Sequence, residues 1–179
     1  MQPSESSTAT RQPLTGSPTE RERFLNFYER ESATTRKVLG AYPGEECDLK
    51  PHDRSNSAKA LASTFVVEQA MILKGLRSEQ VVGGGWPKTA DTWDGLLAEF
   101  DAGREQILNF LRDSDNDVLD GTVTFFVGPK QTGEYRLSDF LNFMTCDQIH
   151  HRGQLSVYLR LAGAKVPSIY GPSADEPWN

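Results

Sequence analysis

Residues 137–160 read LSDFLNFMTCDQIHHRGQLSVYLR, and this stretch decides the fold. Apolar and aromatic side chains recur at helical spacing in it and just beyond it, at Phe140 and Met144 and, three turns later, at Leu155, Tyr158 and Ala162. This period matches the turn of an α-helix, so the stretch predicts one long helix with a stripe that faces a core. Asp147 and His151 lie on the same stripe, one helical turn apart.

Asp147 and His151 are therefore expected to point inward, and each needs a polar partner. A buried polar or charged group without a partner is costly. Side chains four residues apart on a helix lie side by side, so the two can share a metal ion. They can also hydrogen-bond to each other or to a neighbouring helix, and the spacing alone leaves these alternatives open.

Three more segments have helical periodicity: residues 18 to about 42, 57 to about 77, and 89 or 91 to about 112. Ser17 is expected to cap the first of them, with Pro18 at its first position. Residues 122–127 are β-branched and aromatic, residues 128–133 contain turn residues, and residues 134–137 return. The sequence thus predicts an all-α protein, an up-down four-helix bundle with a short β-hairpin between helices 3 and 4.

Two glutamates lie on the inward stripes of the first two helices. Glu31 is expected at the edge of its stripe, where its carboxylate reaches water. Glu68 is expected to point at the core, one turn from Thr64, as a metal ligand or as the partner of His151. The alternative partner of Glu68 is Arg104 on the third helix, which can also extend to water from the edge of its stripe.

Length and composition predict one domain over residues 18–179, with an extended C-terminal tail that folds back over the bundle, after a disordered arm over residues 1–17. The net charge of −6 argues against nucleic-acid binding. No apolar run is long enough for a membrane span, and residues 1–16 lack the apolar centre of a signal peptide. Two cysteines form no disulfide framework, so a cytoplasmic location is expected, with Cys146 as a buried thiol.

The run Asp147-Gln148-Ile149-His150-His151-Arg152-Gly153-Gln154, followed by Tyr158-Leu159-Arg160 and Ala162-Gly163, resembles the last helix of the DinB/YfiT-like proteins. Residues 166–176 also resemble the end of one subset of that family. The resemblance implies a four-helix bundle, a divalent metal held by the second and last helices, and chemistry linked to low-molecular-weight thiols. The sequence departs from the family pattern at Thr64, where relatives have a histidine, and at Asp147, where they often have one.

Two functions follow from these observations. The first is a metal-dependent, thiol-linked transferase or hydrolase whose zinc, nickel or manganese ion is held by His151, Asp147 and Glu68. Its partners would be a small-molecule substrate, a low-molecular-weight thiol and a second copy in a homodimer. The alternative is a non-catalytic small-molecule-binding or structural bundle that has lost the metal site. The inward carboxylates favour a site that still binds something, because unpaired buried carboxylates are costly. The linker that carries Gly83–Gly85 and an anchored Trp86 is expected to line the open end of a cavity.

Overall fold

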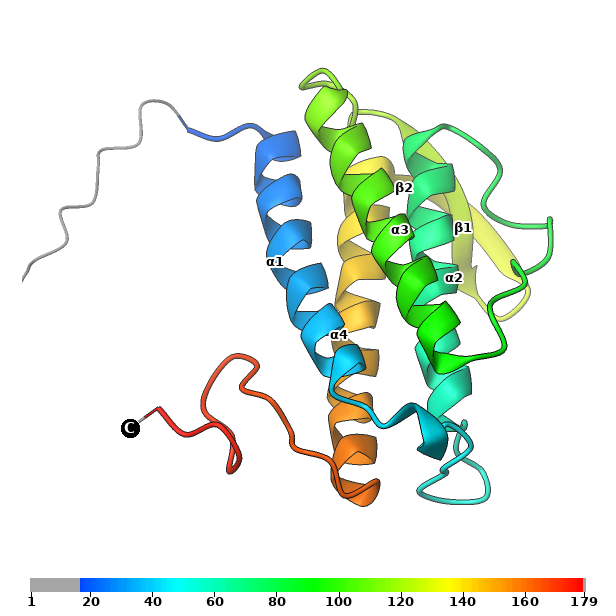
Figure 1. Cartoon of the computed structure of the whole chain (residues 1–179). Coiled ribbons are helices and arrows are strands. Elements are labelled where there is room, and N and C mark those ends of the chain that lie inside the picture. The colour runs from blue at the N-terminus through cyan, green and yellow to red at the C-terminus, as the bar shows by residue number, and fades with distance from the viewer. Residues whose placement is uncertain (1–16, 179) are drawn as a thin grey trace, which may run out of the picture.

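The computed structural model describes residues 17–178, so most of the arm expected over residues 1–17 lies outside the described residues. Four long helices and one small antiparallel sheet make up this part of the chain (Figure 1). The elements are α1 (Glu20–Gly40), a 3-10 turn (Gly44–Glu46), α2 (Ala58–Leu76), α3 (Trp93–Asp113), β1 (Thr122–Gly128), β2 (Gln131–Arg136) and α4 (Leu137–Leu161). The predicted four-helix bundle with a hairpin between helices 3 and 4 is confirmed.

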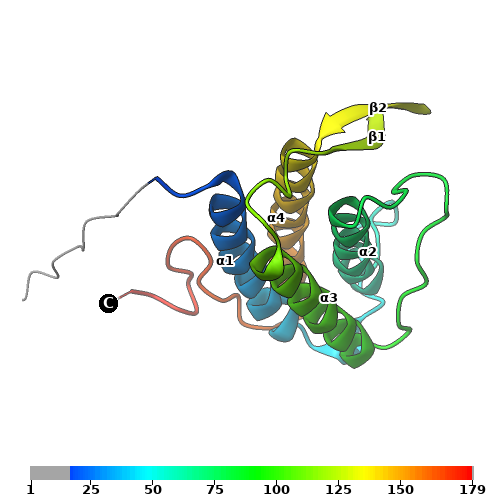
Figure 2. The ribbon, with the colours of Figure 1, turned by 90° about the horizontal axis from the view of Figure 1, so that it is seen from above.

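Seen from above, the four helices occupy the corners of a square (Figure 2). Both α1 and α2 make their main contacts with α3 and α4. The helices α1 and α2 are therefore diagonally opposite each other, as are α3 and α4. The hairpin lies outside this square, against the side of the bundle next to α4 (Figure 2). The buried ring of Phe125 on β1 packs 5.0 Å from the ring of Phe140 on α4 and fixes the hairpin there.

The first helix begins at Glu20, and not at Pro18 as predicted. Thr19 is the N-cap: its hydroxyl accepts from the backbone N–H of Glu22 at 3.1 Å, and the Glu22 carboxylate accepts from the N–H of Thr19 at 2.8 Å. This reciprocal capping box satisfies two backbone donors, which Ser17 and Pro18 cannot do. The third helix likewise begins at Trp93 after the cap Thr92, and not at residue 89 or 91.

The apolar core consists of two clusters at different heights in the bundle. One contains Tyr28, Ile72 and Phe140, and the other contains Phe65 and Leu155. A layer of buried polar side chains separates them, and its members from α1, α2 and α4 are Glu31, Ser32, Thr35, Glu68, Gln69, Thr145, Gln148 and Arg152. Buried polar groups need partners, so this layer is where the fold departs from simple apolar packing.

The C-terminal tail folds back against α1 and α4, as predicted. Glu176 accepts from Lys37 of α1 at 2.6 Å, and Asp175 accepts from Arg160 of α4 at 2.6 Å. Trp178 does not cover the bundle: its side chain is exposed, and its indole N–H donates to Ser168 within the tail. None of the helices in the described part of the chain is long and apolar enough to cross a membrane.

Candidate metal centre

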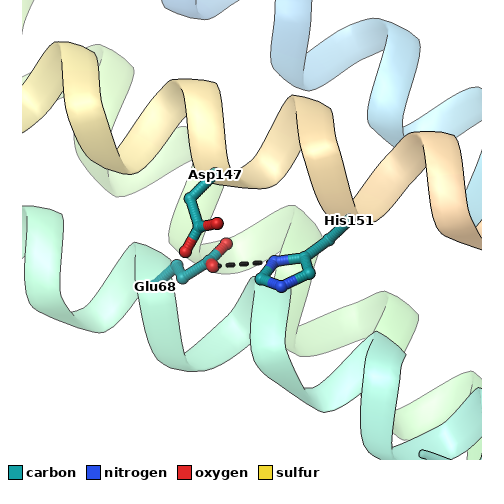
Figure 3. A group of neighbouring side chains, drawn as sticks. All are labelled: Glu68, Asp147 and His151. Carbon is teal, nitrogen blue, oxygen red and sulfur yellow. Dashed lines mark ion pairs between the residues drawn. The ribbon is translucent and has the colours of Figure 1, made fainter. Parts of the chain in front are cut away.

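Glu68 on α2 faces Asp147 and His151 on α4 across the polar layer (Figure 3). The two α4 residues are one turn apart, and Glu68 points between them. Nδ1 of His151 lies 3.0 Å from Oε1 of Glu68. The edge of the His151 ring also packs against Phe65, with ring centroids 6.1 Å apart, so apolar packing fixes the orientation of the imidazole. The structure therefore brings all three predicted site residues together.

The alternative prediction, that Glu68 pairs with Arg104, is wrong. The Arg104 guanidinium donates to the Ser32 hydroxyl at 3.1 Å and to its neighbour Glu105 at 2.9 Å. Both contacts lie on the α1–α3 side of the bundle. Of the two predicted partners of this carboxylate within the protein, His151 is the one that it meets.

The Glu68 carboxylate is buried, but it is poorly satisfied. Neither of its oxygens nor Nδ1 of His151 has a hydrogen-bond partner among the described residues, because the 3.0 Å contact is not aligned as a hydrogen bond. Burial raises the pKa of Glu68 to about 7, against the opposing influence of His151. The Glu68 carboxylate in turn holds the pKa of His151 above its ordinary value, because its effect is larger than the opposing effect of burial.

These three side chains fit a divalent cation. One ligand atom from each residue lies within 4.8 Å of the other two. Two ligands at about 2.1 Å from one ion can be at most about 4.2 Å apart, so a small side-chain rotation brings all three onto one centre. A cation would also satisfy the buried Glu68 oxygens that the protein leaves without partners.

A pocket of about 220 Å³ opens beside the two carboxylates. Its lining residues come from α2, the linker that follows it, β1 and α4: Thr64, Val67, Glu68, Met71, Trp86, Phe125, Phe143, Met144 and Asp147. Trp86 thus borders the cavity as expected for its linker, but its side chain is 66% exposed and is not anchored. The pocket gives a small molecule access to the metal-ligand cluster.

Comparisons with known proteins show the family of this chain. The family model described as the DinB family matches residues 17–178. The chain belongs to the DinB family. A DinB-like protein from Bacillus cereus ATCC 10987 has a similar structure, with a TM-score of 0.66 and 22% identity over 82% of this chain and 95% of that one. The DinB-like protein YjoA from Bacillus subtilis is also similar, with a TM-score of 0.65 and 17% identity over 81% and 95% of the two chains.

A sequence relative matches the chain only locally. The uncharacterized protein YrdA from Bacillus subtilis (strain 168) is 53% identical over 36 residues. That segment is 20% of this chain and 22% of YrdA, so the chain spans about a fifth of the length of the curated relative that it matches.

Several other polar residues lie outside the cluster of Glu68, Asp147 and His151. His150 is exposed and pairs with Gln154 at 2.8 Å, and His52 is exposed in a loop. Thr64 lines the pocket, but its hydroxyl donates to the Ala60 carbonyl at 3.2 Å. Cys146 was predicted to be buried, but it is exposed, because its position on α4 faces away from the bundle.

The prediction that Glu31 reaches water is wrong. Its side chain is 3% exposed, and it accepts from the guanidinium of Arg152 at 2.9 Å and from the hydroxyl of Tyr170. Arg152 is itself 1% exposed and also donates to the backbone carbonyl of Glu31 at 3.0 Å. Burial raises the pKa of Glu31, but donors from Tyr170, Arg152 and Arg30 together outweigh it and leave the pKa below its ordinary value.

Sequence reasoning missed Arg152 because it followed a neighbouring line on α4. The most buried line of that helix runs through Leu141, Thr145, Gln148, Arg152, Leu155 and Leu159. Its spacing of four and three was visible in the sequence, but two polar residues and an arginine interrupt it. Asp147 and His151 are half-buried beside this line, on the side that faces α2.

Proposed function

We propose that Glu68, Asp147 and His151 hold one divalent metal ion, and that this DinB-family protein is a metal-dependent, thiol-linked transferase or hydrolase. One observation carries the proposal: a buried carboxylate without a hydrogen bond to either oxygen, among the described residues, faces a second carboxylate and an imidazole nitrogen. Such a group is costly unless a cation satisfies it. The residue types also match the ligands that divalent ions prefer.

The ligand chemistry narrows the choice of metal. Two carboxylates and one imidazole are a mixed oxygen and nitrogen set, which suits manganese and zinc. Nickel also accepts imidazole, but the single histidine makes the site less favourable for it than a set with two. We therefore expect manganese or zinc ahead of nickel.

The protein's own groups would then have distinct tasks. When bound, the ion supplies a Lewis acid that can generate a nucleophile from a thiol or water at neutral pH. Glu68 and Asp147 would hold it from two different helices, and Phe65 would keep the His151 ring oriented toward it. The apolar pocket beside them would exclude water and position the small-molecule substrate.

The test is metal analysis of tag-free protein by inductively coupled plasma mass spectrometry, after chelation and reloading with each ion. We expect about one equivalent of manganese or zinc in the wild type, because the three ligands define one centre. His151→Ala and Glu68→Gln should lose the ion. The adjacent exposed histidine provides a matched control, so His150→Ala should retain it, as should His52→Ala.

The same experiment decides against the proposal if reloaded wild-type protein holds no ion, or if His150→Ala loses as much metal as His151→Ala. The alternative function would then be favoured, namely a non-catalytic small-molecule-binding or structural bundle. Thr64 supports that alternative, because its hydroxyl is a weak ligand and already donates to the backbone of its own helix.

A further inference from the structure

The walls of the pocket beside Glu68 and Asp147 have an unusual charge distribution. Two carboxylates line it, and among the described residues no lysine, arginine or histidine does. Apart from Thr64, the other lining residues are apolar or aromatic: Val67, Met71, Trp86, Phe125, Phe143 and Met144. Without a bound metal, an anionic ligand would therefore meet two carboxylates and no cationic side chain, and a neutral apolar group would meet complementary walls.

Three aromatic side chains line this pocket, namely Trp86, Phe125 and Phe143. The Phe125 ring is fixed by Phe140 and lies 6.2 Å from the ring of Phe143, which is 48% exposed. Trp86 stands on a segment with left-handed glycines at Gly83 and Gly85, whose φ angles are 102° and 75°. The exposed indole also lines a second, adjoining pocket of about 150 Å³.

An indole that is two-thirds exposed at the mouth of an apolar pocket leaves much apolar surface in water. A ligand that packs against it removes that surface from water and gains an aromatic contact. The volume limits the size of the ligand, because an apolar cavity of about 150 Å³ accommodates benzene. A pocket of about 220 Å³ therefore suits one substituted ring.

We propose that this pocket binds an uncharged small molecule with one aromatic ring, packed between Trp86, Phe125 and Phe143, with its substituent directed at Glu68 and Asp147. The inference rests on the proposed function in placing the reacting end of this substrate at the metal ligands. It names the substrate class that the site takes. Any anionic part of a thiol co-substrate would lie outside these walls, since among the described residues they offer it no positively charged side chain.

The experiment is isothermal titration of full-length protein, both metal-free and manganese-loaded, with three ring compounds of similar size: benzyl alcohol, benzoate and benzylamine. Benzyl alcohol is expected to bind, and benzoate is expected to bind the metal-free protein at least about tenfold more weakly because of repulsion by the carboxylates. Trp86→Ala should weaken benzyl alcohol by about tenfold through the lost aromatic contact. Trp178→Ala is the matched control, since that indole is 67% exposed and outside the pocket, and it should leave binding unchanged.

The proposal is overturned if benzoate binds the metal-free protein as tightly as benzyl alcohol, if the two tryptophan variants behave alike, or if benzylamine binds the manganese-loaded protein more tightly than benzyl alcohol. Failure of the ring-pocket proposal can be distinguished from failure of the metal-site proposal. Binding of benzyl alcohol that depends on Trp86 in a protein that takes up no metal supports the ring pocket alone. Stoichiometric metal without binding of benzyl alcohol refutes the ring pocket and leaves the metal site standing.

Discussion

Replacement of Arg152 by methionine tests how the polar layer contributes to stability. The guanidinium is buried between α4, α1 and the C-terminal tail. Its Nη2 donates to Oε2 of Glu31 at 2.9 Å and to the Tyr170 hydroxyl at 2.6 Å, and its Nη1 donates to the Glu31 carbonyl and to Thr35. Methionine keeps much of the side-chain volume and removes every one of these donors, so the change isolates the polar contribution.

The expected cost follows from what the substitution leaves behind. Removal of one partner from a buried ion pair typically costs about 3–5 kcal/mol, because the other charge stays buried. Glu31 would keep donors from Tyr170 and Arg30, so we expect the lower end, about 3 kcal/mol. That is a large part of a total stability on the order of 5–15 kcal/mol. The melting temperature should fall by about 6–12 °C for a domain of this size.

The assay is urea unfolding at pH 7, followed by circular dichroism, on Arg152→Met, Glu31→Gln and the double variant. The double variant should be more stable than the sum of the two single costs predicts, because it removes the buried charge and its partner together. Arg160→Met is the matched control: its guanidinium pairs with Asp175 at 2.6 Å but is exposed, so the cost should be at most about 1 kcal/mol. Equal costs for the two arginine variants, or additive costs in the double variant, would refute the reasoning.

Two further predictions concern the metal centre and the acid limit of stability. Thr64→His places an imidazole on the pocket wall one turn from Glu68, and it should raise affinity for zinc and nickel relative to manganese, measured by competitive metal titration. Unchanged metal preference would show that position 64 does not reach the ion. The lowered pKa of Glu31 predicts stability that is fully present above its unfolded pKa near 4.5 and is lost as the pH falls through its lower folded pKa. Urea unfolding from pH 7 to pH 3 should show this loss, and Glu31→Gln should reduce it; parallel profiles would contradict the assignment.

The helices and the inward positions of Glu68, Asp147 and His151 were accessible from sequence because both depend on local periodicity, whereas the meeting of the second and last helices at one site was what the resemblance to the DinB/YfiT-like proteins implied. An i, i+4 pair on one stripe shares a helix face in any fold, and Glu68 was the inward carboxylate of the expected neighbouring helix. The start of α1 was also visible in principle, since Thr19 and Glu22 have the spacing of a capping box. Ser17 and Pro18 also match the pattern of a cap followed by the first helical residue, but the helix in the structure begins after Thr19.

The pairing of Arg152 with Glu31 and Tyr170 was not accessible in the same way. Adjacent residues on a helix point about 100° apart, so a broad stripe allows either of two neighbouring lines to face the centre. Which line does so depends on where α1 and the tail pack, and these contacts join residues more than a hundred positions apart. Periodicity within one helix contains no information about that choice.

The two halves of the polar layer differ in a way that bears on function. Toward α1, the buried Glu31 carboxylate has donors from Arg152, Arg30 and Tyr170. Toward α2, the one polar contact of the buried Glu68 carboxylate within residues 17–178 that the structure gives is an unaligned one with His151. The same helix supplies both faces, so the fold is able to satisfy a buried carboxylate fully at this depth. Glu68 also lines the pocket, so its side of the layer is open to a partner from outside the chain, as the proposed cation would be.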